Sequence, residues 1–231
     1  MSISGFEALI RWFHPKYGLI TPDLFLPIAE ESSLISEIGQ FVIFEACKQM
    51  QLWKDLGFHD MRISINIVAQ QIHRGQLLEH IEMALNIYNL TAECIDLELT
   101  ESSLIDKSAH VIEFLQNLKK RGITISLDDF GTGYSSLAYL ADYPIDTLKI
   151  DKAFISKIGQ TKDNAIVNAI IAMGKAMGMK IVAEGVENIQ QIEYLQARDC
   201  DYFQGYYFSK PLNSNDCTDF LLKNKVRADL S

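Results

Sequence analysis

The stretch ITISLDDFGTGYSS, residues 123–136, joins an alternating apolar run to two adjacent aspartates and a loop bracketed by glycines. The apolar and polar residues alternate with the period of a β-strand. Asp128 and Asp129 follow where that strand is expected to end. Two neighbouring carboxylates repel each other unless a cation lies between them. The stretch therefore favours either a cation site or a solvated turn, and the rest of the chain has to separate the two.

Segments of the same strand character recur along the chain, with helical patterns between them. Besides Ile123–Asp128, the expected strands are Ile3–Ile10, Met61–Val68, Ile95–Leu99, Thr147–Ile150, Lys180–Ala183 and Asp201–Phe203. Helices are expected near 22–31, 34–56, 76–88, 108–121 and 163–177, after Asn188, and after 213–216. Strands that alternate with helices indicate βα units around a parallel sheet. With no linker in 231 residues, we expect one domain over residues 1–231, a TIM-like (β/α) barrel.

Composition narrows the function classes. The formal net charge of −9 makes a nucleic acid polymer an improbable partner. The four cysteines form no CxxC pair, so they are interpreted as reduced thiols of a cytosolic protein. No segment has the length and apolar character of a signal peptide core or a membrane span. We therefore expect a cytoplasmic protein with no membrane contact by this chain.

A charged or amide side chain lies at or near the end of every expected strand. In chain order these residues are Glu7 with Arg11, Asn66, Glu98, Asp128 with Asp129, Lys149, Glu184 and Gln204. The carboxyl ends of the strands of a parallel barrel share one face, and enzymes of this architecture build their sites there. An acid after a strand often caps the next helix. A residue of this kind on every strand favours a site instead.

The residue types indicate the chemistry of that site. Carboxylates with one amide and no histidine form a hard oxygen set that suits Mg²⁺ or Mn²⁺. The chain has no HExxH, GxSxG or evident Cys–His arrangement, which leaves zinc hydrolases and nucleophilic triads weakly supported. Asp128 and Asp129 are best explained as a bridge between two ions of the kind that clamp a phosphoryl displacement. Because strand side chains alternate between faces, the alternation has to break at Asp129.

The segment FEALIRW, residues 6–12, carries a Glu-Ala-Leu signature, and the chain resembles the EAL-type cyclic di-GMP phosphodiesterase domains. The resemblance covers essentially the whole chain through FLPIAE, SIN, LELTES, LDDFGTGYSSL, LKIDKAFI, VAEGVE and QGYYFSKP. It implies a TIM-like barrel. It also implies metal-dependent hydrolysis of cyclic di-GMP to linear pGpG in bacterial second-messenger signalling.

The resemblance also implies roles for individual residues. The ligands of the first metal would be Glu7, Asn66, Glu98 and Asp128. Asp128 would bridge to a second ion beside Asp129 and Glu184. Two Mg²⁺ or Mn²⁺ ions are implied. Ca²⁺ is expected to bind but inhibit, because its longer bonds of about 2.3–2.6 Å misplace the water.

Four further side chains receive roles around these ligands, and Glu184 receives a second one. Lys149 would contact the attacking water, and Glu184 would be either the general base or only a ligand. Arg11, expected on the same strand face as Glu7, would hold a substrate phosphate. Gln204 would close the site near Lys149, and Glu101 would brace the DFGTGYSS loop.

Two alternatives to the enzyme stay open. A catalytically silent cyclic di-GMP receptor would use the same fold, but such receptors typically lack some of the acids that are all present here. A metal-dependent carbon–carbon lyase would use the oxygen ligands but not the paired bridging aspartates, and the fold alone does not exclude it.

Seven strands are expected where a complete barrel has eight. The family usually places a helix and a strand ahead of the Glu-Ala-Leu strand, so this chain resembles an N-terminally short form. A missing strand leaves two unpaired edges. We therefore expect an upstream extension, such as a regulatory domain, a partner chain, as in a homodimer, or an altered N-terminus to cover them.

Overall fold

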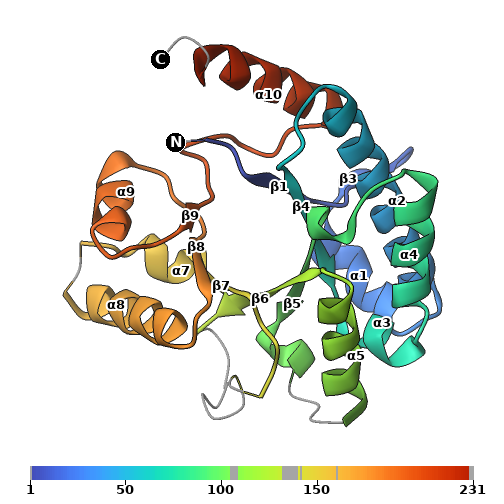
Figure 1. Ribbon diagram of the computed structural model, residues 1–231, viewed down its shortest axis with the longest axis horizontal. Coiled ribbons are helices and arrows are strands. Elements are labelled where there is room, and N and C mark those ends of the chain that lie inside the picture. Colours follow the sequence, from blue (N-terminus) through green and yellow to red (C-terminus); the bar gives the residue numbers. More distant parts are fainter. Residues whose placement is uncertain (1, 105–108, 132–139, 141, 160, 229–231) are drawn as a thin grey trace. The chain divides into compact units, whose positions relative to one another are not determined.

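The computed structural model describes residues 2–104, 109–131, 140, 142–159 and 161–228 (Figure 1). The chain forms two compact units. The first comprises Met1–Leu97, Arg121–Ile123 and Leu212–Ser231, and the second comprises Glu98–Lys120 and Thr124–Pro211. Strand β5 (Ile95–Thr100) begins in the first unit and ends in the second.

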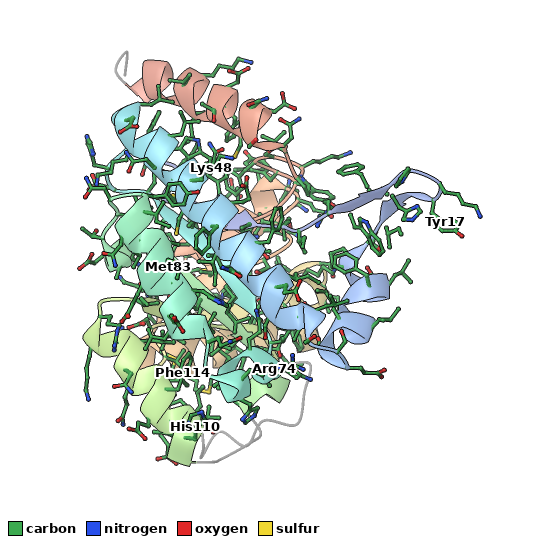
Figure 2. All side chains as sticks on the ribbon, turned by 90° about the vertical axis from the view of Figure 1, so that its right-hand side faces the viewer. Tyr17, Lys48, Arg74, Met83, His110 and Phe114 are labelled. Carbon is green, nitrogen blue, oxygen red and sulfur yellow. The ribbon has the colours of Figure 1, made fainter. Side chains whose placement is uncertain are left out.

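In the first unit the strand order is β1-β4-β5. β1 (Gly5–Ala8) pairs in parallel with β4 (Arg62–Ile67), with Glu7 opposite Ser64. A separate antiparallel hairpin, β2 (Trp12–His14) and β3 (Gly18–Ile20), follows β1. Figure 2 shows Tyr17 at the hairpin tip, pointing away from the body of this unit.

The helices of the first unit surround a large aliphatic core. They are α1 (Pro22–Glu30), α2 (Leu34–Asp55), α3 (Ala69–Arg74), α4 (Leu77–Ile87), the 3-10 helix η1 (Ala92–Cys94) and α10 (Ser214–Ala228). Trp53 of α2 stacks near Phe6 of β1, with ring centroids 5.0 Å apart. Its indole N–H donates to Thr218 Oγ1 at 3.0 Å, which ties α2 to α10.

In the second unit the strand order is β5-β6-β7-β8-β9, and β6 to β9 pair in parallel. The added strands are β6 (Thr124–Phe130), β7 (Thr147–Ile150), β8 (Lys180–Ala183) and β9 (Tyr202–Phe203). The helical segments are η2 (Glu101–Leu104), α5 (Ala109–Lys120), α7 (Lys152–Ile155), α8 (Thr161–Ala176) and α9 (Ile189–Gln196). Ile125, Leu148 and Ile181 are fully buried, and α8 packs on β7 and β8.

An aspartate clasps the amino end of β7. Asp146 directly precedes the strand and accepts the Ile125 backbone N–H of β6 at 2.8 Å. It also forms an ion pair with Lys119 in the last turn of α5. One carboxylate therefore joins three successive elements of a βα unit.

A second aspartate clasp repeats this arrangement before β9. Asp201 accepts the Ile181 backbone N–H of β8 at 2.8 Å. It also forms an ion pair of 2.6 Å with Lys175 in the last turn of α8. Burial alone would raise the pKa of Asp201, but the hydrogen bonds from Lys175, Ile181 and Lys180 lower it overall. The two aspartate clasps, Asp146 and Asp201, thus stabilise the sheet at the ends where these strands begin.

Each of the seven predicted strand segments contains a strand in the described structure, and β7 and β8 have the predicted bounds. β1 is shorter than predicted and ends at Ala8, whereas β6 runs on to Phe130. The hairpin and the short helices α3 and α7 were not predicted, because three to six residues are too few to show a clear periodicity. The GTGYSS loop and the expected start of α5 at Ser108 fall largely outside the described residues. In the part of the chain that the structure describes, no helix is long and apolar enough to cross a membrane.

Candidate active site

The two adjacent aspartates lie on a β-bulge at the end of β6. Leu127 pairs with Leu148 and Phe130 with Ile150, so β6 has one more residue than β7 between these pairs. Asp129 has a φ of 54°, in the left-handed region that aspartate tolerates better than most residues. The predicted break in strand alternation at Asp129 is therefore confirmed.

The bulge brings both aspartates to a third acid. Asp128, Asp129 and Glu184 each offer a carboxylate oxygen, and the three oxygens lie within 4.8 Å of one another. Glu184 directly follows β8. Asp128 Oδ1 also accepts the backbone N–H of Asp129 at 2.9 Å. We call these three residues the acidic cluster.

Lys149 of β7 lies buried among carboxylates. Its Nζ is 2.7 Å from Glu98 Oε1, 2.7 Å from Glu184 Oε1 and 3.4 Å from Asp128 Oδ1. The Lys149 and Glu98 side chains are 3% and 2% exposed. The acidic cluster and Glu98 contribute four formal negative charges against one ammonium. The remaining three negative charges attract further cations.

The charge of this region acts on Asp129. Partial burial, the neighbouring charge of Asp128 and contacts with Asp151 raise the pKa of Asp129 to about 6, and Lys149 lowers it. At pH 7 the Asp129 carboxylate is therefore mostly ionised, and this charge lowers the stability of the metal-free protein. A cation bound at the acidic cluster would remove that cost.

The first unit brings together two more of the predicted ligands. Asn66 Nδ2, at the end of β4, donates to Glu7 Oε1 of β1 at 2.7 Å. This contact leaves the Asn66 amide oxygen as an acceptor. An amide oxygen beside a carboxylate has the ligand chemistry predicted for Mg²⁺ or Mn²⁺.

Comparison with known proteins places the chain in a family. The model of the EAL domain family matches residues 1–211. The chain belongs to the EAL family. This EAL domain is 44% identical over 209 residues to MucR of Pseudomonas aeruginosa, a bifunctional diguanylate cyclase/cyclic di-GMP phosphodiesterase, covering 90% of this chain and 30% of MucR. It is 44% identical over 223 residues to the signalling protein YkoW of Bacillus subtilis, covering 96% of this chain and 28% of YkoW.

Solved structures support the predicted fold class, a TIM-like (β/α) barrel, and the described residues contribute seven strands to its sheet. The structure of the P. aeruginosa MucR phosphodiesterase with c-di-GMP is 43% identical, with a TM-score of 0.86 over 91% of this chain and 86% of that one. The EAL enzyme Bd1971, with cAMP and cyclic di-GMP bound, is 36% identical, with a TM-score of 0.88 over 95% of this chain and 61% of that one. The EAL domain itself spans less than a third of the length of its curated relatives MucR and YkoW.

Arg11 of the EAL domain is not where the strand pattern predicted it. β1 pairs with β4 only through Gly5–Ala8, so Arg11 lies beyond the strand and not on the strand face of Glu7. Its exposed guanidinium donates through Nη1 to Ile10 O at 2.8 Å. Alternating residue types do not show where pairing stops, and here it stops before the β2–β3 hairpin begins.

The supporting roles of Glu101 and Gln204 stay predictions. Glu101 is buried in η2, and the backbone N–H of Gly131 donates to its Oε1 at 3.4 Å, which fits a brace at the start of the loop. The rest of that loop lies outside the described residues. The Gln204 backbone N–H donates to Ala183 O at 2.8 Å, and its side chain is exposed.

Asp151 is a further acid next to the site. It caps α7, with its Oδ1 accepting the Ala153 N–H at 2.7 Å, and it faces Asp129. The sequence signal for this role is an aspartate immediately before a short helical segment.

Replacing Asp129 by asparagine is expected to stabilise the metal-free EAL domain at pH 7.5. The carboxyl pKa is raised on folding, so the folded state loses stability as pH rises from about 4 to about 6, and the neutral amide avoids this loss. Thermal unfolding across pH 4–8 measures the difference, which should shrink as the pH falls below 6. Mn²⁺ should raise the Tm of the wild type more than that of the variant.

The matched control for this prediction is Asp199→Asn. Asp199 is also exposed and has a φ of 58°, so this variant measures what asparagine contributes in the left-handed region. At pH 7.5 the gain in Tm from Asp129→Asn should exceed the gain from Asp199→Asn. Equal gains in the two variants would contradict the expected cost of the Asp129 charge.

Proposed function

We propose that this EAL domain hydrolyses cyclic di-GMP to linear pGpG with two Mg²⁺ or Mn²⁺ ions, in bacterial second-messenger signalling. The acidic cluster carries the proposal, because its three carboxylate oxygens lie within 4.8 Å of one another beside the buried Lys149. The 43% identical MucR phosphodiesterase, solved in a c-di-GMP complex, supports the substrate class.

The residues present fit divalent ions with a preference for oxygen. The acidic cluster of Asp128, Asp129 and Glu184 would hold one ion. By family resemblance the other ligands are Glu7, Asn66, Glu98 and Asp128. When bound, such ions supply an activated water and offset charge on the phosphate.

The side chains of the chain supply the rest of the chemistry. Glu184 would either accept a proton from a water beside the acidic cluster, as the general base, or serve only as a metal ligand. The Lys149 ammonium lies close to three carboxylates, and exchange of one of these partners would let it hold that water or a phosphate oxygen. The exposed guanidinium of Arg11 offers a planar fork of donors for a substrate phosphate.

We further propose that the domain works in the cytoplasm as part of a larger signalling assembly, with cyclic di-GMP as its small-molecule partner. Support comes from the curated relatives, two of which are a named phosphodiesterase and a signalling protein more than three times as long as the matched region. The regulatory input would come from a flanking domain or from a second copy of the chain.

Chromatography of cyclic di-GMP after incubation with the protein tests the proposed function. We expect conversion to pGpG with Mg²⁺ or Mn²⁺ and none with EDTA. Ca²⁺ should bind and inhibit, because its bonds are longer and its geometry looser. Intact cyclic di-GMP after long incubation with folded, metal-loaded protein would contradict the enzyme. Calorimetric binding without turnover would then favour the silent receptor.

A further inference from the structure

The loop between β8 and α9 begins with Glu184 and is tied to both neighbouring strands. The Glu184 N–H donates to Ile150 O, the last residue of β7, at 3.1 Å. Val186 is fully buried, and its N–H donates to Gln204 O at 2.9 Å, next to the end of β9. These contacts hold the first half of the loop in place. The second half depends on another residue.

That residue is Gln191, whose side chain is buried and bonded at both ends. Its Oε1 accepts the N–H groups of Glu187 at 2.7 Å and Asn188 at 3.2 Å. Its Nε2 donates to Ile155 O at 3.0 Å. One amide thus joins the end of the Glu184 loop to the end of α7, which lies beside α9 and β8 in Figure 1.

These contacts exceed what a helix start requires. In a capping box the third helical residue accepts the N-cap N–H, and Gln191 does this for Asn188. Gln71 makes the same contact with the Val68 N–H at 3.0 Å, at the start of α3. The bonds of Gln191 to Glu187 and Ile155 are not part of the capping box. They connect the two segments that follow the proposed active-site residues Glu184 and Lys149.

Both loops lead directly to the site. Only Ile150 and Asp151 separate Lys149 from the start of α7, and the other loop begins with Glu184. Between them Gly185 has a φ of 66°, and a Cβ at this position would lie 2.4 Å from Lys152 Cβ. The tightness of this contact lets a shift at one loop reach the other. The Glu184–Lys149 ion pair at 2.7 Å therefore depends on how the two loops are joined.

We propose that Gln191 is a positioning residue that holds Glu184 in register with Lys149. This inference rests on the proposed function of the site. Gln191 contacts no reacting atom in it. Its effect on rate arises because misplacement of a catalytic group by about 1 Å costs up to about a hundredfold.

The test compares Gln191→Met with Asn188→Ala. Methionine keeps the length of the side chain but removes all of its hydrogen bonds, whereas Asn188→Ala weakens the helix start and keeps the Gln191 amide. We expect Gln191→Met to lower kcat about tenfold or more relative to Asn188→Ala, with KM within about twofold. Equal kcat values in the two variants would overturn the inference.

A double-mutant cycle separates positioning from general damage. If Gln191 acts through Glu184, adding Gln191→Met to Glu184→Gln should lower the residual rate no further. If the double variant loses as much rate as the two single variants together, Gln191 does not act through Glu184. Should Gln191→Met not fold, Gln191→Glu replaces it, because it keeps the acceptor for two N–H groups and loses the donor to Ile155. The kcat of Gln191→Glu is expected to fall as well, and an unchanged kcat would overturn the inference.

Mn²⁺ alone distinguishes a failure of this inference from a failure of the proposed function. The Mn²⁺-induced rise in Tm reports the geometry of the acidic cluster without any substrate. Gln191→Met should reduce that rise more than Asn188→Ala does, even if the wild type hydrolyses no cyclic di-GMP. Equal rises in the two variants would count against positioning, whatever the activity of the wild type.

Discussion

Replacing Lys149 by methionine is expected to lower the unfolding temperature of the metal-free protein markedly and to slow hydrolysis of cyclic di-GMP strongly. The ammonium lies within 2.7 Å of Glu98 and Glu184, and the Lys149 side chain is 3% exposed. Its removal leaves buried carboxylates without their cation, which costs about 3–5 kcal/mol of unfolding free energy. Turnover should fall roughly 100- to 1,000-fold, because a donor to the reacting oxygens is lost.

Divalent ions should partly reverse the loss of stability in Lys149→Met. Carboxylates without the ammonium gain more from a bound cation, so Mn²⁺ should raise the Tm of the variant more than that of the wild type. The matched control is Lys180→Met on the neighbouring strand. The Lys180 side chain is 62% exposed and pairs with Asp201 at 3.2 Å, so its loss should cost less than about 1 kcal/mol. Equal Tm values for the two variants would show that Lys149 does not neutralise the site.

Replacing Asp128 by asparagine is expected to abolish turnover while keeping the fold. Asparagine has nearly the same shape and keeps an acceptor for the Asp129 N–H, but it removes the central charge of the acidic cluster. The proposed clamp of two ions would then be incomplete, so we expect a fall in kcat of about a thousandfold or more. The metal-free variant should be no less stable than the wild type, because the charge of Asp128 raises the pKa of Asp129.

Two measurements check the Asp128 prediction. Product formation gives the rate, and calorimetric titration with Mn²⁺ gives the ion affinity, which should fall sharply. Asp142→Asn, at an exposed position of the same unit, is the control for the chemical change itself. A variant at Asp128 with near-normal rate and affinity would exclude the acidic cluster as the metal site.

The parts of the fold that the sequence predicted well are short strand-like runs between turn residues. β7 and β8 were predicted with their full bounds, because turn residues flank both TLKI and KIVA. The position of Asp129 followed from a chemical requirement, since two adjacent strand residues share a ligand only if the alternation breaks. The bulge between β6 and β7 meets that requirement.

Other features depend on tertiary contacts that alternation does not encode. Lys149 was expected to contact a water, and its three carboxylate neighbours come from three different segments. The end of β1 is set by how far it pairs with β4, which displaced Arg11 from its expected face. The helix start at Asn188 and Gln191 was predicted from a capping pattern, but the bond from Gln191 to Ile155 crosses 36 residues of chain.

The aspartate clasps have a consequence for how such a domain evolves. Asp146 and Asp201 stabilise the ends where β7 and β9 begin, while the repelling carboxylates gather where β6 and β8 finish. Stability and chemistry are thus assigned to opposite ends of the strands. If the domain has the proposed function, a lineage that loses an acid of the cluster gives up that reaction, yet it keeps its clasps and loses a source of repulsion. Descendants that no longer hydrolyse their ligand should therefore remain stably folded, so that selection can act on ligand binding alone.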